Sequence, residues 1–247
     1  NILKRDAIAD PDKTYGVVKK AFDQKYGLIW LKPFGFNNTY TLTMRREQAE
    51  RLGIQTISDL GAYVRRHDET QQGERLEAGF NPEFMERPDG YKGLKEAYEF
   101  EFPKVFQMET GRMYKACQDK DVDVICAFAT DGRIRAFDLQ VLEDDRDFFP
   151  PYYAAPLVRK EALEKYPEMR AVLNRLAGTL DDETMRSLNY RVDEKGEDPM
   201  EVAREFLRSK GLLGEQAGGP DAAGADDAQP KAPAGQELPD DGAAAPE

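Results

Sequence analysis

The segment from Trp30 to Arg45, W-L-K-P-F-G-F-N-N-T-Y-T-L-T-M-R, joins two strand-like runs through an irregular stretch. The first run ends at Leu31, where a proline and a glycine interrupt any regular strand or helix. After two asparagines, Tyr40, Leu42 and Met44 alternate with other residues, which predicts a strand with these side chains on one face. We therefore expect the chain to cross here from one part of the fold to another.

Aromatic rings and small amides gather at this first crossover. Phe34, Phe36 and Tyr40 stand beside the two asparagines. Ring faces suit an apolar or cationic group, and amides suit a polar group. The segment therefore fits a ligand that has an apolar or cationic body and a polar end. The same rings also fit an ordinary hydrophobic core, and the segment alone leaves both interpretations open.

A second crossover is predicted between Phe148 and Arg159, F-F-P-P-Y-Y-A-A-P-L-V-R. Consecutive prolines require an extended path, and Tyr152 and Tyr153 follow them directly. Aromatic residues thus again stand where the chain changes direction.

Helices and strands alternate along most of the chain. Asp10-Pro11, Asn81-Pro82 and Asp198-Pro199 are helix starts, and Gly27 ends the first of these helices before a strand at 28–31. Further on we expect a helix that Ser58 caps, a polar surface loop at 67–75, and strands at 104–108, 122–128 and 139–142. Four later segments have helical apolar spacing, 160–166, 168–177, 181–188 and 199–210. This alternation predicts an α/β sandwich.

The charge is concentrated at one end. From Gly214 onward there are eight acidic residues and one lysine, whereas the preceding chain has 39 acidic and 34 basic residues. No basic face is indicated, which argues against a nucleic-acid partner. The segment 214–247 is rich in Ala, Gly, Pro and Asp, and we expect it to be disordered. There is no apolar run of membrane-spanning length.

Catalytic and metal chemistry find little support. The two cysteines lie in apolar patterns, and the one histidine lies in a charged segment, so we expect no metal and no cofactor. Asp131, Asp144 and Asp145 could line a hydrolytic cleft, but neither a histidine nor an activated cysteine is placed to assist them. We therefore expect a protein that is not an enzyme and keep the hydrolase as an alternative.

Six short motifs follow one another in a defined order. Together the chain resembles the substrate-binding proteins of ABC importers for quaternary ammonium compounds, the glycine betaine, choline and carnitine group, over roughly residues 2–213. The motifs are F-N-N-T-Y (36–40), E-F-M-E-R-P-D-G-Y (83–91), T-D-G-R-I (130–134), L-E-D-D (142–145), F-F-P-P-Y (148–152) and L-N-Y-x-V-D (188–193).

The resemblance implies a two-lobed α/β fold of the type II periplasmic-binding-protein class, with the ligand cleft between the lobes. Residues 1–37 and 152–213 would form lobe one, residues 38–151 lobe two, and 214–247 a disordered tail. The family begins with a further lobe-one strand and a Y-T-G-T motif that do not precede Ile2 here. We therefore expect lobe one to be incomplete.

The resemblance also implies a binding site. Tyr40, Phe128 and Tyr152 would wall a box for the trimethylammonium group, and Arg87 would meet a ligand carboxylate. A quaternary ammonium has no N–H to donate, so ring faces hold it at roughly 1 to 2 kcal/mol per desolvated contact. A guanidinium can grip a carboxylate through two parallel hydrogen bonds. Phe128 departs from the family's commoner tyrosine.

Two of these positions have simpler explanations. Arg87 could be a surface arginine paired with Glu86 or Asp89, and Phe128 could be the last core residue of its strand.

The resemblance implies a monomeric, extracytoplasmic solute-binding protein on the periplasmic or extracellular side of the cytoplasmic membrane. Its partners would be a small quaternary ammonium ligand and the membrane permease of an ABC importer. A sensor, or a binding domain fused to a permease, would use the same residues and remains an alternative.

Overall fold

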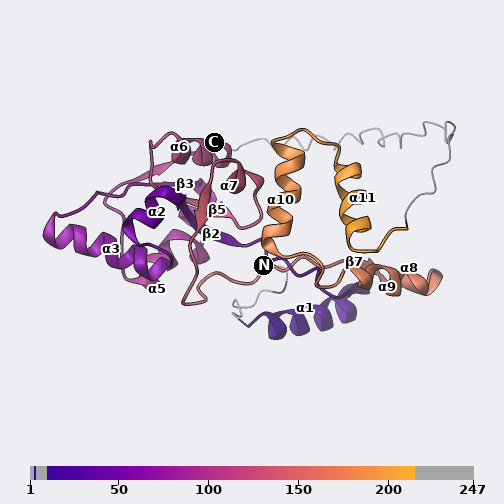
Figure 1. Ribbon diagram of the computed structural model, residues 1–247. Helices are drawn as coiled ribbons and strands as arrows, with labels where there is room; N and C mark the ends of the chain where they lie inside the picture. Colours follow the sequence, from indigo (N-terminus) through magenta and orange to yellow (C-terminus); the bar gives the residue numbers. More distant parts are fainter. Residues whose placement is uncertain (1–2, 4–9, 215–247) are drawn as a thin grey trace, which may run out of the picture. The chain divides into compact units, whose positions relative to one another are not determined.

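The computed structural model describes residue 3 and residues 10–214, which contain two sheets (Figure 1). The larger sheet has the strand order β4-β3-β5-β2-β6. Its strands are β2 (Tyr40–Arg45), β3 (Ala78–Phe80), β4 (Val105–Gln107), β5 (Val124–Phe128) and β6 (Leu139–Val141). The smaller sheet pairs β1 (Leu28–Trp30) with β7 (Leu157–Arg159) in antiparallel fashion. The predicted tail, residues 214–247, lies outside the described residues except for Gly214.

Strand β2 lies inside the larger sheet, antiparallel to both β5 and β6. The other contacts are parallel, with β3 between β4 and β5. The prediction that one face of β2 is apolar was incomplete, because Thr41, Thr43 and Arg45 on the other face are buried as well. Both faces of β2 are therefore covered, as expected for an interior strand.

Helices connect and flank these strands. The Asp-Pro starts are confirmed: the Asp10 carboxylate accepts a hydrogen bond from the backbone N–H of Lys13, and Asp198 caps the last helix in the same way. The helices are α1 (Pro11–Tyr26), α2 (Arg46–Leu52), α3 (Ile57–Thr70), α4 (Pro82–Glu86), η1 (Pro88–Lys92), α5 (Gly93–Tyr98), α6 (Thr110–Gln118), α7 (Gly132–Ala136), α8 (Lys160–Lys165), α9 (Glu168–Leu173), η2 (Asn174–Leu176), α10 (Asp182–Asp193) and α11 (Pro199–Ser209). Among the described residues, no helix is both long and apolar enough to cross a bilayer.

Helix α3 differs from its prediction at both ends. Thr56, not Ser58, is the N-cap: its hydroxyl accepts from the N–H of Asp59, whose carboxylate accepts from the N–H of Thr56 in return. The helix then continues to Thr70 through residues predicted as a loop. Polar residues are compatible with an exposed helical face, so their polarity alone did not mark the end of the helix.

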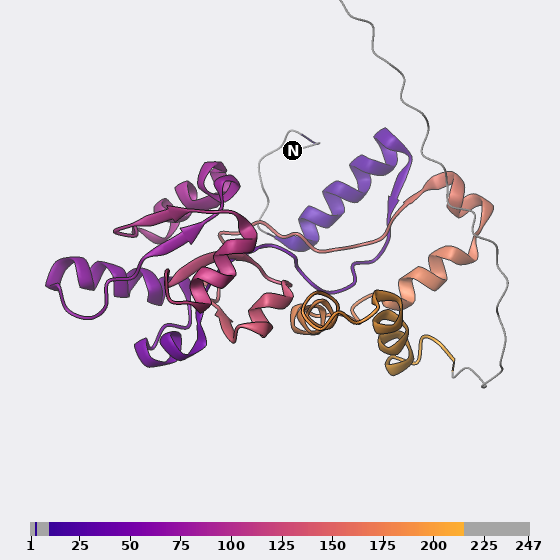
Figure 2. The same ribbon diagram turned by 90° about the horizontal axis from the view of Figure 1, so that it is seen from above.

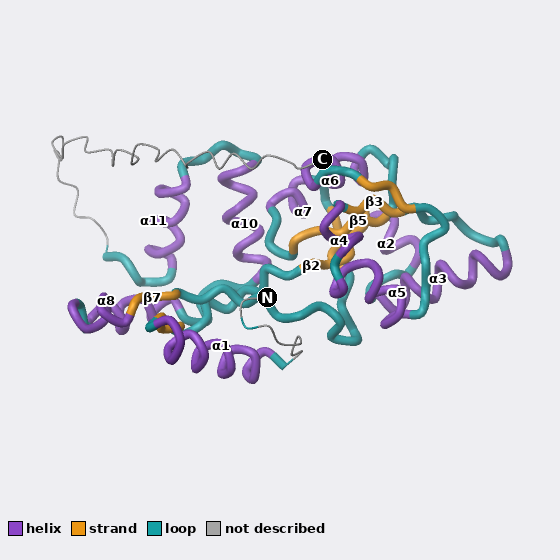
Figure 3. Tube along the Cα trace, turned by 180° about the vertical axis from the view of Figure 1, so that it is seen from behind, coloured by secondary structure: helices purple, strands orange, loops and turns teal. Residues whose placement is uncertain are grey.

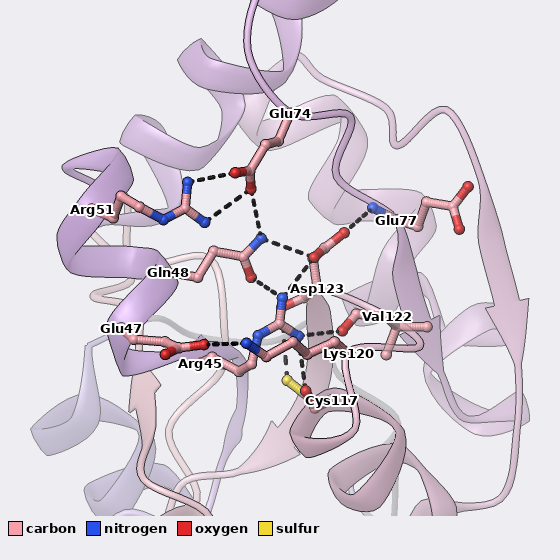
Figure 4. A network of polar contacts seen from close by, with 10 residues as sticks. All are labelled: Arg45, Glu47, Gln48, Arg51, Glu74, Glu77, Cys117, Lys120, Val122 and Asp123. Atoms are coloured by element: carbon pink, nitrogen blue, oxygen red, sulfur yellow. Dashed lines mark hydrogen bonds and ion pairs between the residues drawn. The ribbon is translucent and has the colours of Figure 1, made fainter.

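A buried polar network anchors the far end of β2 (Figure 4). The Arg45 guanidinium donates to the carbonyls of Cys117 and Val122 at 2.8 and 2.7 Å, to the Asp123 carboxylate at 2.8 Å and to the Gln48 amide oxygen. These bonds tie the end of β2 that lies opposite Tyr40 to α2, to α6 and to the residues before β5.

The two predicted crossovers lie side by side (Figures 2 and 3). The N–H of Phe34 donates to the carbonyl of Ala154 at 2.9 Å, and the N–H of Asn38 to that of Tyr152 at 3.3 Å. The N–H of Tyr152 donates to the Asn37 side-chain oxygen at 2.6 Å. Two segments more than 100 residues apart in sequence are therefore held together directly before Tyr40 and at Tyr152.

Candidate functional site

Tyr40 and Phe128 face each other across neighbouring strands. They are partners in the register of β2 and β5, and their ring centroids are 4.7 Å apart. The ring of Phe84 lies 5.1 Å from that of Tyr40. Only 8% of Tyr40 is exposed, whereas Phe128 is half-buried. Tyr40 is thus part of the core, as one interpretation had it, while Phe128 stands at its edge.

Helix α4 brings charged groups to this edge. Asn81 caps the helix by accepting from the N–H of Phe84 at 2.7 Å, and Pro82 occupies the first helical position. Glu83 and Arg87 are four residues apart and so lie on one face, where Arg87 Nη1 is 2.9 Å from Glu83 Oε1. The second carboxylate oxygen of Glu83 accepts from the Tyr40 hydroxyl at 3.3 Å.

Arg87 connects the groups from both crossovers. Its Nη2 donates to the Tyr152 hydroxyl at 2.9 Å, and its guanidinium carbon lies 6.0 Å from the Tyr40 ring centroid. The structure therefore joins all four predicted residues, Tyr40, Arg87, Phe128 and Tyr152, through direct contacts. Tyr152 is the most open of them, with 48% of its surface exposed.

Asp89 holds the guanidinium of Arg87. Nε and Nη2 of Arg87 donate to its two carboxylate oxygens at 2.8 and 2.7 Å. This hydrogen bonding raises the pKa of Arg87 and lowers the pKa of Asp89, so both groups are charged at neutral pH. The edge of Arg87 that would grip a ligand with two parallel bonds is thus taken by Asp89. The ion pair expected with Glu86 or Asp89 forms with Asp89 and Glu83.

Burial, together with the neighbouring Glu83 carboxylate, raises the pKa of Tyr40. Its hydroxyl is therefore a neutral hydrogen-bond donor at physiological pH.

A second set of contacts links the residues after β5 to the first crossover and to α10. The Thr130 hydroxyl donates to the Asn38 side-chain oxygen at 2.9 Å, and the Asn189 amide donates to the Thr130 carbonyl at 2.8 Å. Gly132 lies so close to α10 that a Cβ there would be 2.6 Å from the backbone nitrogen of Tyr190. These contacts hold the backbone that follows Phe128.

The three candidate catalytic acids all serve local structure. Asp131 caps α7 and pairs with Arg133, whose hydrogen bonds outweigh the effect of burial and lower the pKa of Asp131. Asp144 accepts from the backbone N–H groups of residues 148 and 149 and from Tyr98, and Asp145 accepts from the N–H of Ser58. Each carboxylate thus has a structural role.

Glu83 is the residue of this site that the sequence did not single out. Its spacing from Arg87 was a visible signal for an ion pair, but its contact with Tyr40 depends on the packing of α4 against β2.

Comparison with known proteins places this geometry in context. Residues 11–209 match the family model described as the substrate binding domain of ABC-type glycine betaine transport system. Carnitine transport binding protein OpuCC of Listeria monocytogenes is 40% identical over 207 residues, which cover 83% of this chain and 64% of that protein. A glycine-betaine-binding protein of Pseudomonas aeruginosa is 42% identical over 216 residues, which cover 86% of this chain and 69% of that protein.

A solved structure of similar fold is the crystal structure of a glycine betaine/carnitine/choline ABC transporter. It has a TM-score of 0.78 and 36% sequence identity, and the match covers 86% of this chain and 75% of the other. This likeness confirms the predicted α/β fold of two-lobed binding proteins. The chain spans about two thirds of the length of the two curated relatives, 64% and 69%.

Proposed function

Because the chain belongs to the family of substrate-binding domains of ABC-type glycine betaine transport systems, we propose that it captures a quaternary ammonium solute and delivers it to a membrane permease. The observation that carries this proposal is the paired rings of Tyr40 and Phe128, joined through Arg87 to Tyr152. Glycine betaine, choline and carnitine share the methylated cationic nitrogen that aromatic faces attract.

Each residue has a distinct task in the proposed site. The partly exposed ring of Phe128 and the exposed ring of Tyr152 contact the methyl groups, and Tyr40 supports Phe128 from the core side. Arg87 is the partner of a ligand carboxylate. Within the described residues, four of its five N–H groups are already engaged, so it meets the ligand through the second hydrogen of Nη1.

The proposed working unit is a monomer outside the cytoplasmic membrane. Residues 1–37 and 152–213 contribute to one lobe and residues 38–151 to the other, with ligand bound where the crossovers meet. Closure of the lobes on the ligand provides the signal that the permease reads. The protein leaves its ligand chemically unchanged, and the structural roles of Asp131, Asp144 and Asp145 support this.

Calorimetric titration of the full-length protein with glycine betaine, choline, carnitine and proline betaine tests the proposal. We expect micromolar binding of at least one of them. Tyr152→Leu should weaken that binding about tenfold, the loss of one desolvated ring contact. Tyr166→Leu is the control, since Tyr166 is a similarly exposed tyrosine, at 45% against 48%, on the chain after α8. Absence of heat with all four compounds would refute the proposal.

A further inference from the structure

The charges around the aromatic rings do not balance. Arg87 contributes one positive charge, while Asp89 and Glu83 contribute two negative ones. Asp89 balances the positive charge of the Arg87 guanidinium through a two-point ion pair. The Glu83 carboxylate is therefore an excess negative charge beside the rings.

Glu83 also lies beside the position where a ligand carboxylate would meet Arg87. One of its oxygens binds Nη1 of Arg87 at 2.9 Å, and the other accepts from the Tyr40 hydroxyl at 3.3 Å. Nη1 carries the remaining N–H of Arg87, so a ligand carboxylate that approaches it meets the negative charge of Glu83. Two carboxylates at one guanidinium nitrogen repel each other.

We propose that Glu83 determines the charge class of the ligand, so that the site prefers a quaternary ammonium cation with a hydroxyl end, such as choline, over a zwitterion with a carboxylate, such as glycine betaine. This inference rests on the proposed function. A hydroxyl end can donate to the Glu83 carboxylate, whereas a carboxylate end cannot. The cationic end gains from the excess negative charge in either ligand, but only the zwitterion brings a negative charge to Glu83.

The structure offers an isosteric test and a matched control on the same short helix. Glu83→Gln removes the charge and keeps one oxygen that can accept from Arg87 Nη1, while its amide N–H can donate to the Tyr40 hydroxyl oxygen. Because the Glu83 side chain is 61% exposed, this change should leave folding intact, and the thermal unfolding midpoint checks that. Glu86→Gln removes an equal charge at another exposed position of α4.

The experiment measures the dissociation constants of choline and glycine betaine for each protein by calorimetry. In the wild type we expect choline to bind more tightly. In Glu83→Gln the ratio of the two constants should shift about tenfold towards glycine betaine, because the charge that repels the ligand carboxylate is removed. In Glu86→Gln the ratio should stay within about twofold.

A wild type that prefers glycine betaine, or a ratio that is unchanged in Glu83→Gln, would overturn the role of Glu83 while leaving the proposed function in place. Failure of every folded variant to bind either compound would instead refute the proposed function, and this inference with it.

Discussion

At the scale of single residues, other groups of the protein itself set the orientation of Arg87. Asp89, two positions along the chain, takes the Nε and Nη2 edge, and Tyr152 from the second crossover takes the other hydrogen of Nη2. The guanidinium is therefore in place beside the Tyr40 ring before any ligand arrives, and little side-chain entropy remains to be lost on binding.

Asp89→Asn should lower the free energy of unfolding by about 1 kcal/mol at neutral pH, because it removes one half of a charge-assisted, two-point bond. The pKa of Asp89 is lowered in the folded state, so this contribution is fully present above its ordinary pKa of 3.8 and is lost as the pH falls below that value. Chemical unfolding at several pH values measures the difference between the two proteins. A difference that grew on acidification would contradict this account.

Asp119→Asn is the control for that series. Asp119 forms an exposed pair with Lys115 on α6, and its loss should change stability by less than about 0.5 kcal/mol.

Gly132→Ala should destabilise the protein by about 1 to 3 kcal/mol, because the new Cβ would lie 2.6 Å from the backbone nitrogen of Tyr190 and 2.8 Å from its Cα. Backbone cannot rotate out of the way as a side chain can. Gly16→Ala is the matched control in the exposed part of α1, where nothing lies within 4 Å, and it should stabilise by about 0.5 to 1 kcal/mol. Equal effects of the two substitutions on the unfolding midpoint would argue against close packing of α7 on α10.

At the scale of elements, local signals predicted the helices well and the burial of strands less well. Asp10-Pro11, Asn81-Pro82 and Asp198-Pro199 all start helices, because capping and the fixed φ of proline act within four residues. The burial of both faces of β2 depends on elements that are distant from it in sequence. The contact of Glu83 with Tyr40 likewise depends on packing between elements that are distant in sequence. The sequence therefore indicated that Glu83 lies near Arg87, but not that it lies beside the aromatic rings.

The corrected start of α3 gives a prediction at this scale. Thr56→Ala should cost about 1 kcal/mol of folding stability, since it removes the hydroxyl that caps the N–H of Asp59 and with it one half of the capping box. Ser58→Ala, two residues inside the helix, should cost less than about half as much. Chemical unfolding of the two variants distinguishes the two cap positions, and a larger effect at Ser58 would restore the cap expected from sequence.

At the scale of the whole molecule, the two crossovers bring distant parts of the chain together at the proposed site. Proline and aromatic placement predicted both crossovers, but not that they run side by side with backbone hydrogen bonds between them. The pairing of β1 with β7 and the order of the larger sheet were likewise beyond local reasoning. The four site residues followed from the family resemblance, and the structure adds the contacts that join them.

In the proposed site, aromatic ring faces hold a positive charge, and not only an apolar shape. Calorimetry with choline and with 3,3-dimethyl-1-butanol, its uncharged isostere, measures this directly. Because an attraction between cation and ring face vanishes with the charge, we expect choline to bind at least about tenfold more tightly. Equal affinity for the two compounds would contradict the account.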